Sequence, residues 1–355
     1  MTNRIYLRPT GFIDAPFGHD GKVARLAGGL AWFSLLEVIG GGEPELVPVE
    51  AVTDRLGQWG EEARAAWDNL TAAREPLTLG TRTVRLDQPQ AVGIVNVTPD
   101  SFSDGGRHFE HNIAGDAGFA MASAGAAIVD VGGESTRPGA KPVWEQDEIE
   151  RVLPVVQRLA ASGTAVSIDT RKAAVMEAAL RAGAGLVNDV SALTFDPLSA
   201  PTVAKAGCPV VLVHHQGTPE TMQAAPRYGR PVLLEVYDWL EQRIEAAVAA
   251  GIDRSGIVVD PGIGFGKTVQ HNLQLLNGLA ILHGLGCAVM IGASRKRMIG
   301  ALSGEAPADE RLGGSLALAV KGAEQGAQLI RVHDVPETVQ ALKVWRGLRD
   351  AALAP

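Results

Sequence analysis

From residue 91 onward, short apolar runs rich in β-branched residues alternate with longer segments of helical periodicity. The runs occupy residues 91 to 96, 126 to 133, 164 to 169, 185 to 189, 209 to 214, 256 to 260, 288 to 294 and 328 to 333. Between them, segments such as EIERVLPVVQRLAAS place apolar residues three and four positions apart, which is the spacing of one helix face. Near-continuous apolar strands separated by helices predict a parallel sheet covered on both faces.

Eight such units in about 265 residues match the usual size of a closed (β/α)₈ TIM barrel. A doubly wound open sheet stays the alternative, because periodicity does not detect the closure of a sheet. We therefore expect an α/β chain whose barrel occupies residues 89 to 355.

Residues 1 to 88 have a different pattern. They contain a strand-like opening at residues 4 to 11, an apolar stretch at 30 to 39, a second candidate strand at 44 to 52 and a helical segment at 61 to 73. This pattern predicts a small α+β extension packed on the barrel. A stabilising appendage or a dimer contact is the simpler interpretation of this unit. A partner-binding role would depend on exposure of the aromatic residues Trp32, Phe33 and Trp59.

The composition is that of an ordinary globular protein. The 355 residues are 46% hydrophobic and 20% charged, which is enough for one large core and an additional unit. A formal net charge of −8 argues against a nucleic-acid partner. The N-terminal residues lack the apolar core of a signal peptide, and the apolar stretch at 26 to 36 is interrupted by Glu37 well short of a membrane span. We expect a cytoplasmic protein with no membrane partner.

Each apolar run ends at or near a polar residue. In chain order these residues are Asn96, Asp130, Asp169, Asn188, His214, Asp260, Ser294 and His333. A single polar residue at a strand end means little, because strands end near solvent. In a parallel barrel, however, all of these positions share the C-terminal mouth, where such barrels have their active sites. The pattern therefore predicts a ligand site at that mouth.

The residue types at the predicted mouth indicate two kinds of recognition. The acceptors Asp169, Asn188 and Asp260 suit a flat heterocycle that presents a ring N–H and an exocyclic amine. Hydroxyls and cations that suit phosphate oxygens are Ser135, Thr136, Arg137, Ser294, Arg295, Lys296, Arg331 and His333. A nucleotide-like ligand with a phosphate tail is the generic inference, although a surface salt bridge is the simpler interpretation of any isolated basic residue.

Two short patterns suggest other ligands and fail on inspection. The segment PGIGFGKT at residues 261 to 268 resembles a phosphate-binding loop, but Pro261 stands where that pattern requires glycine. Its glycines instead allow the backbone to approach a planar ring closely, with Phe265 available to stack. The adjacent His214 and His215 suggest zinc, but neighbouring residues on a strand point to opposite faces.

Seven motifs along the chain carry a specific resemblance. They are NVTPDSFSDGG, DVGGESTRPGA, SIDTRK, VNDVSA, VVDPGIGFGKT, IGASRK and RVHDV, and they begin at residues 96, 130, 167, 187, 258, 291 and 331. In order and approximate spacing the chain resembles the dihydropteroate synthase family over about residues 90 to 350. The resemblance implies a TIM barrel and a transferase that joins 6-hydroxymethyl-7,8-dihydropterin diphosphate to p-aminobenzoate, releasing pyrophosphate and 7,8-dihydropteroate. It also implies a homodimer.

The resemblance further implies a role for each matching residue. Asn96 and Asp104 match ligands of a Mg²⁺ cofactor. The residues that match pterin-holding positions are Asp169, Asn188, Asp260 and Lys296, with Phe265 beside them. The residues that match groups around the diphosphate are Thr136, Arg137, Arg331 and His333, while Phe102 and Pro138 would border p-aminobenzoate. Catalysis is accordingly expected from Asn96, Lys296, Arg331 and His333, and no residue stands out as a general base.

Two other functions stay open from the sequence. Pterin-binding methyltransferases share the barrel and the ring-binding carboxylates, but they would have little use for diphosphate-facing residues such as Arg137 and Arg331. A non-catalytic pterin-binding paralogue is the other alternative, with residues 1 to 88 as an interaction module. Retention of the diphosphate-facing residues counts against that alternative.

Overall fold

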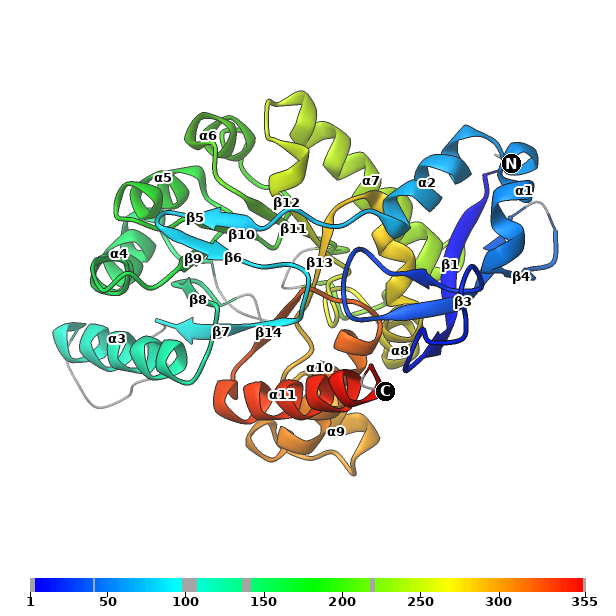
Figure 1. The fold of residues 1–355 in the computed structure, drawn as a ribbon. Coiled ribbons are helices and arrows are strands. Elements are labelled where there is room, and N and C mark those ends of the chain that lie inside the picture. Colours follow the sequence, from blue (N-terminus) through cyan, green and yellow to red (C-terminus); the bar gives the residue numbers. More distant parts are fainter. Residues whose placement is uncertain (1–3, 41, 98–106, 136–141, 218–220, 354–355) are drawn as a thin grey trace.

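The structure is a computed structural model of the chain, and it describes residues 4–40, 42–97, 107–135, 142–217 and 221–353. Eight parallel strands form a closed barrel surrounded by helices (Figure 1). The strands are β7 (Gln90–Asn96), β8 (Ile128–Gly132), β9 (Val166–Asp169), β10 (Leu186–Asp189), β11 (Val210–Val213), β12 (Ile257–Asp260), β13 (Ala288–Ile291) and β14 (Leu329–Val332). Pairing of Ile330 in β14 with Ala91 in β7 closes the ring. The predicted TIM barrel is confirmed, and the open sheet is excluded.

Helices follow the strands and cover the outside of the barrel. They are α3 (Arg107–Ser123), α4 (Glu145–Ala161), α5 (Ala173–Arg181), α6 (Ser199–Ala206), α7 (Val232–Ala249), α8 (Val269–Asn277), α9 (Arg297–Leu302), α10 (Leu312–Glu324) and α11 (Val335–Ala352). Within the described residues, 3₁₀ helices include η2 (Arg254–Gly256), η3 (Leu279–Leu285) and η4 (Ala308–Glu310). In α4, Val152, Val156 and Leu159 form one buried face, as the helical spacing predicted.

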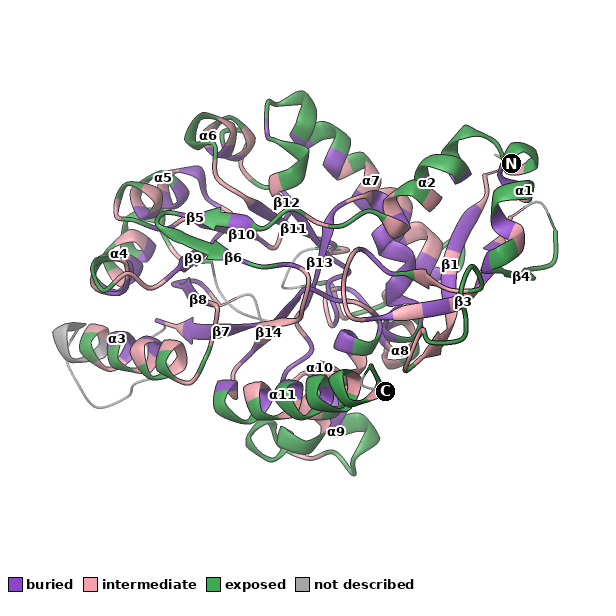
Figure 2. Cartoon of the chain, in the orientation of Figure 1, coloured by how far each residue is buried: buried purple, intermediate pink, exposed green. Residues whose placement is uncertain are grey.

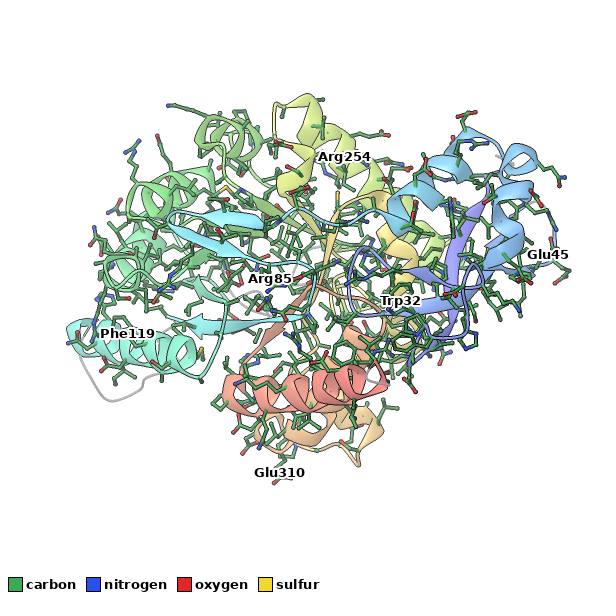
Figure 3. All side chains as sticks on the ribbon, viewed as in Figure 1. Trp32, Glu45, Arg85, Phe119, Arg254 and Glu310 are labelled. Carbon is green, nitrogen blue, oxygen red and sulfur yellow. The ribbon has the colours of Figure 1, made fainter. Side chains whose placement is uncertain are left out.

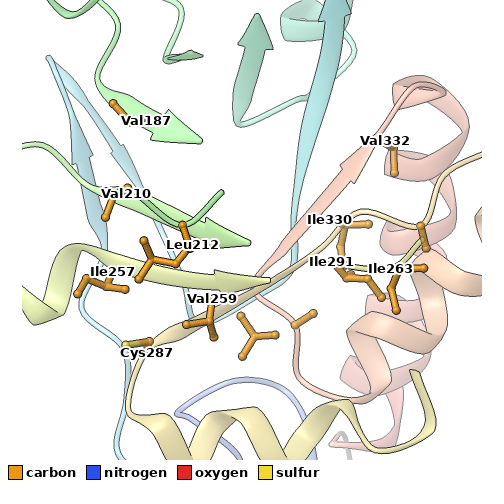
Figure 4. Packing of buried hydrophobic residues seen from close by; sticks show 14 of the residues in the cluster. Val187, Val210, Leu212, Ile257, Val259, Ile263, Cys287, Ile291, Ile330 and Val332 are labelled. Carbon is orange, nitrogen blue, oxygen red and sulfur yellow. The ribbon is translucent and has the colours of Figure 1, made fainter. Parts of the chain in front are cut away.

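Apolar side chains form a layer between the strands and the outer helices. Val187, Leu212, Val259 and Ile291 belong to this layer, each from a different strand (Figure 4). Alternate strand residues point into the barrel instead, and side chains fill the enclosed space (Figure 3). The barrel is therefore a packed core that leaves the ligand chemistry to its C-terminal mouth.

A short hairpin closes the opposite end of the barrel. It consists of β5 (Leu77–Leu79) and β6 (Arg82–Val84), and its apolar residues belong to the same cluster as the inward-pointing Leu186 and Val258. No separate element was predicted for these residues. Although these residues precede residue 88, their packing partners are those of the barrel, and the division at residue 88 stays a prediction.

Residues 4 to 71 form a separate α+β unit beside the barrel (Figure 1). Its elements are β1 (Tyr6–Ile13), β2 (Ala24–Arg25), β3 (Trp32–Ile39), β4 (Glu45–Pro48), α1 (Val49–Trp59) and α2 (Glu61–Thr71). An independent cluster that includes Leu7, Leu36 and Leu70 forms its core. This unit, which we call the N-terminal unit, packs against η3 and α7.

One expectation for the N-terminal unit is wrong. The candidate strand at residues 44 to 52 ends at Pro48, because α1 begins at Val49 and Pro48 has the extended backbone of a helix N-cap. The partner-binding alternative depended on the exposure of three aromatic residues, of which Phe33 is completely buried, while Trp32 and Trp59 are half-buried. The strand β3, which carries Trp32 and Phe33, is buried or intermediate along its length (Figure 2). These three residues therefore give that alternative no support. Among the described helices, none has the length and hydropathy needed to cross a membrane.

Candidate active site

Four side chains from different strands meet inside the C-terminal mouth of the barrel. Arg331 on β14 donates from Nε to Asp130 and from Nη2 to Asp169, each over 2.6 Å. Asn188 on β10 donates to the same oxygen of Asp130 over 2.9 Å. Asp130 and Asn188 are buried, and the remaining side-chain oxygen of each has no hydrogen-bond partner among the described residues. Such unsatisfied buried acceptors are costly, and a ligand that presents N–H donors would satisfy them.

The charges of this cluster perturb one another. Burial raises the pKa of Asp169 to about 7, while Arg331 opposes the rise and the Asp130 carboxylate adds to it. For Arg331, burial acts against the charged form, but the two aspartates outweigh it and raise the pKa of the guanidinium above its usual value. Arg331 is therefore a fixed cation, and Asp169 is the titratable member of the pair.

Asp260, at the end of β12, is the third predicted acceptor at the mouth. It is 4% exposed and accepts a 2.6 Å hydrogen bond from the backbone N–H of Gly262. Burial raises its pKa, while the Gly262 hydrogen bond, Lys296 and Arg331 oppose that rise. Gly262 has a positive φ, and a Cβ there would lie 1.8 Å from the carbonyl oxygen of His214. A side chain at position 262 would therefore disturb the loop that holds Asp260.

An aromatic ring and an amine lie together beside Asp260. Lys296, from the loop after β13, places Nζ 4.0 Å from the ring centroid of Phe265. A Cβ on Gly264 would lie 3.1 Å from Cδ of Lys296, so the glycine backbone and the lysine stem are also in close contact. We call Phe265 and Lys296 the ring floor, because an aromatic face next to a cation suits stacking of a planar ligand.

Lys267 contributes a contact that the sequence did not predict. Its buried Nζ lies 2.8 Å from Nδ1 of His214, 3.1 Å from the carbonyl oxygen of Phe265 and 3.4 Å from that of His214. Burial lowers the pKa of Lys267 well below its usual value, although Asp260 opposes this. From the sequence, the glycines and Phe265 of this segment are expected to face a planar ring and its lysine has no predicted role, yet Lys267 ties the loop after β12 to the end of β11.

A second unpredicted cluster lies where the loop after β8 begins and ends. Glu134 accepts from the backbone N–H of Val143 and from Nε of Arg171, each over 2.9 Å, and Lys172 lies 3.0 Å from the same carboxylate. Although burial alone would raise it, Arg171 and the Val143 amide hold the pKa of Glu134 below its usual value. Lys172 also pairs with the buried Glu148 at 2.5 Å. Glu134 lies within the motif DVGGESTRPGA, and this position in a family motif was the feature of the sequence that could have identified it as a site residue.

The remaining predicted residues fall into two groups. His333 lies with Nδ1 3.1 Å from Oγ of Ser294, which joins two of the predicted strand ends. Asn96 ends β7 and pairs in register with Gly132. The predicted residues that lie outside the described part of the chain are Phe102, Asp104, Thr136, Arg137 and Pro138. Among the described residues, His, Cys, Asp and Glu form no group of three that could hold a metal ion.

Comparison with known proteins agrees with this arrangement. Residues 92–333 match the family described as pterin binding enzyme. The chain belongs to this pterin-binding enzyme family. Relatives in it include the dihydropteroate synthases of Escherichia coli, 46% identical over 73% of this chain and 91% of the relative, and of Mycobacterium leprae, 48% identical over 72% and 92%.

Solved structures of pterin-binding enzymes show the same fold. The dihydropteroate synthase of Xanthomonas albilineans with 4-aminobenzoic acid has a TM-score of 0.74 and 46% identity, covering 78% of this chain and 99% of its own. That of Yersinia pestis in complex with a sulfonamide drug has a TM-score of 0.73 and 46% identity, again over 78% and 99%. The matched structures are thus covered almost completely, whereas about a fifth of this chain has no counterpart in them.

Proposed function

We propose that this chain is a dihydropteroate synthase, which joins 6-hydroxymethyl-7,8-dihydropterin diphosphate to p-aminobenzoate and releases pyrophosphate. The observation that carries the proposal is the convergence of Asp169, Asn188 and Asp260 beside the ring floor, inside the mouth of the barrel. Identity of 46% to 48% with dihydropteroate synthases supports it. The Xanthomonas albilineans enzyme has also been solved in complex with 7,8-dihydropteroate.

The pterin would be held by acceptors above the ring floor. Its ring N–H groups and exocyclic amine are donors, and the oxygens of Asp260 and Asn188 are buried acceptors. The unsatisfied Oδ1 of Asn188 would gain a partner when the pterin binds. Phe265 would support the ring face, with the Lys296 amine at the ring edge. Orientation of the substrate is therefore the first contribution of these residues to the rate.

The reaction itself needs no nucleophile from the protein. The C–O bond to the diphosphate breaks, the electron pair leaves with the phosphate oxygen, and the dihydropterin ring delocalises the positive charge on its methylene carbon. The amine of p-aminobenzoate then forms the C–N bond and loses a proton. His333 and Arg331 would offset charge on the leaving oxygens. Arg331 engages Asp130 and Asp169 through Nε and Nη2, so Nη1 is the nitrogen we assign to this contact.

A Mg²⁺ cofactor fits the chemistry of the described residues. Mg²⁺ prefers oxygen ligands and is commonly held by one or two protein side chains together with substrate phosphates. Asn96 offers an amide oxygen at the mouth, and the other residue that matches a Mg²⁺ ligand, Asp104, lies outside the described residues. When bound, the ion would neutralise charge on the diphosphate. We further propose that the protein is a homodimer, as the family resemblance implies, and that it is cytoplasmic, as expected from N-terminal residues that lack the apolar core of a signal peptide.

The test is release of pyrophosphate by the purified protein with dihydropterin diphosphate and Mg²⁺, measured with and without p-aminobenzoate. We expect release that depends on p-aminobenzoate, with dihydropteroate as the product. Pterin binding without any turnover would instead indicate the non-catalytic paralogue. Pyrophosphate release that is the same with and without p-aminobenzoate and yields no dihydropteroate would exclude the synthase.

A further inference from the structure

A polar contact joins the N-terminal unit to the start of α7. The hydroxyl of Tyr6 on β1 lies 2.9 Å from both carboxylate oxygens of Asp238, and Arg230 donates to the same hydroxyl over 3.3 Å. Arg230 also pairs with Asp238 at 2.5 Å. The Tyr6 ring is buried edge-on against Tyr237 at 5.6 Å between centroids. Arg230 therefore has partners on both the N-terminal unit and the barrel.

Arg230 belongs to a segment that also contacts the loop after β12. We call residues 221 to 231, which lead into α7, the strap. Its end is rigid, since the Glu235 carboxylate accepts from the backbone N–H groups of Gly229 over 2.9 Å and of Arg230 over 3.2 Å. Two residues before Arg230, the hydroxyl of Tyr228 donates to the carbonyl of Gly266 over 2.9 Å. The strap thus touches the N-terminal unit and the loop after β12 within three residues.

The strap binds the backbone on both sides of Phe265, the aromatic residue of the ring floor. Gln223 of the strap donates to the carbonyl of Gly264, and Tyr228 donates to that of Gly266. These two carbonyls flank Phe265, whose ring lies beneath the Lys296 amine. The loop is wound tightly here, because a Cβ on Gly266 would come 2.5 Å from the carbonyl oxygen of Gln216. Displacement of the strap would therefore displace the backbone on both sides of Phe265.

We propose that Tyr6 is a positioning residue for the pterin site, and that the N-terminal unit braces the ring floor through Arg230 and Tyr228. This inference rests on the function proposed above. A floor already held in its binding geometry loses less conformational freedom when the ligand arrives, which improves affinity. The N-terminal unit lies outside residues 92–333, which match the family, so the family match does not account for the brace.

The first test is Tyr6→Phe, which removes the hydroxyl and keeps the ring against Tyr237. We expect the affinity for 6-hydroxymethylpterin, measured by calorimetry, to fall roughly threefold to tenfold, the range that corresponds to one lost hydrogen bond. KM for dihydropterin diphosphate should rise by a similar factor, and KM for p-aminobenzoate should change less. The matched control is Arg55→Gln, which removes an exposed ion pair with Glu45 elsewhere in the N-terminal unit and should leave both values unchanged.

The outcomes separate the brace from the proposed function. If the wild-type protein binds no pterin, the proposed function fails together with the site. If the wild type binds pterin and Tyr6→Phe binds it equally well, the brace is wrong and the function stands. If Tyr6→Phe folds poorly, Arg230→Gln is the second variant. It removes the contact between Arg230 and the Tyr6 hydroxyl by changing an exposed residue of the barrel.

Contiguity of contacts does not prove coupling, so a double-mutant cycle is the decisive measurement. Tyr228→Phe removes the hydrogen bond to Gly266 and is expected to weaken pterin binding on its own. If Tyr6 acts through Tyr228, the double variant should bind no more weakly than the weaker single variant. Fully additive losses would show that Tyr6 influences the site by another route, and the brace as stated would be overturned.

Discussion

The Nζ atom of Lys267 lies 2.8 Å from Nδ1 of His214 and so joins the loop after β12 to the end of β11. The backbone carbonyls of Phe265 and His214 complete a set of three acceptors around the amine. Three acceptors match the three N–H groups of an ammonium, while burial favours the neutral amine. These contacts hold the loop after β12 in place, and their cost is the free energy of removing the Lys267 amine from water.

We therefore predict that Lys267→Met weakens both binding and stability. Pterin affinity should fall roughly tenfold, because the carbonyl of Phe265 loses the donor that holds it. The unfolding midpoint should also fall, because buried acceptors of His214 and Phe265 are left without their donor at a cost of about 1 to 3 kcal/mol, which the smaller desolvation cost of methionine offsets only in part. Calorimetry with 6-hydroxymethylpterin and thermal unfolding measure the two effects. Lys205→Met, at an exposed position on α6, is the control, and unchanged pterin affinity in Lys267→Met would refute the role.

The barrel could be predicted from the sequence because most residues of its strands are buried. Residues 209 to 213, for example, form a continuous apolar run, and β11 occupies Val210–Val213 with every residue buried. Closure of the barrel was harder to predict from the sequence, because it depends on the pairing of β14 with β7, and no local sequence pattern indicates that pairing. The number of strand–helix units and the length of the segment favoured a closed barrel over an open sheet, and the motif resemblance supported that choice.

The contacts between loops could not be predicted, because their partners are far apart in the chain. Lys267 and His214 are separated by 53 positions, and Arg331 and Asp130 by 201. Each residue was visible within a motif or at a strand end, but its partner was not. In the N-terminal unit, a local pattern was misleading instead. The apolar residues at 44 to 52 suggested one strand, but the strand ends at Pro48, which is the N-cap of a helix that begins at Val49. The motifs and strand ends identified which residues could bind a ligand, but their hydrogen-bond partners became known only from the fold.

Arg331→Ala tests how strongly the cluster at the mouth depends on its cation. Removal of the guanidinium leaves Asp130 and Asp169 without the donor that each holds at 2.6 Å. We expect a loss of about 3 to 5 kcal/mol in the free energy of unfolding at pH 8 and a smaller loss at pH 5, where the raised pKa lets Asp169 become neutral. Urea denaturation at both pH values measures this.

The matched control for Arg331→Ala is Arg181→Ala, which breaks an exposed ion pair on α5 and should cost less than about 1 kcal/mol. Turnover should be lost in Arg331→Ala even where the protein is folded, because a cation near the leaving diphosphate is gone. A folded variant with normal turnover would remove Arg331 from the proposed mechanism.

The pH dependence of stability follows from the sign of the Asp169 shift. Its pKa is about 7 in the folded protein and has the ordinary value of 3.8 when unfolded, so between these values the folded state binds more protons. The free energy of unfolding from this group therefore decreases as pH rises from about 4 to 7. Asp169→Asn should remove that part of the slope, as measured by urea denaturation across the interval. The exposed Asp116→Asn serves as control, and identical slopes in wild type and Asp169→Asn would contradict the shift.

Two truncations separate the roles of the N-terminal unit and the hairpin. Deletion of residues 1 to 72 removes the N-terminal unit but keeps Arg74, which donates to the carbonyls of Cys287 and His283 over 3.1 and 2.8 Å. Deletion of residues 1 to 88 also removes the hairpin, whose Leu77 and Leu79 cover the closed end of the barrel. Each such buried side chain contributes roughly 1.5 to 3 kcal/mol.

We expect the shorter deletion to leave a folded barrel with weakened pterin binding, because the ring floor loses its brace. The longer deletion should aggregate and bind a hydrophobic dye, because the inward-pointing ends of the strands become exposed to water. Size-exclusion chromatography and dye fluorescence distinguish these outcomes. A soluble, fully active product of the longer deletion would show that the hairpin is dispensable. Aggregation of the shorter one would mean that the N-terminal unit covers surface the barrel cannot leave exposed, in addition to bracing the floor.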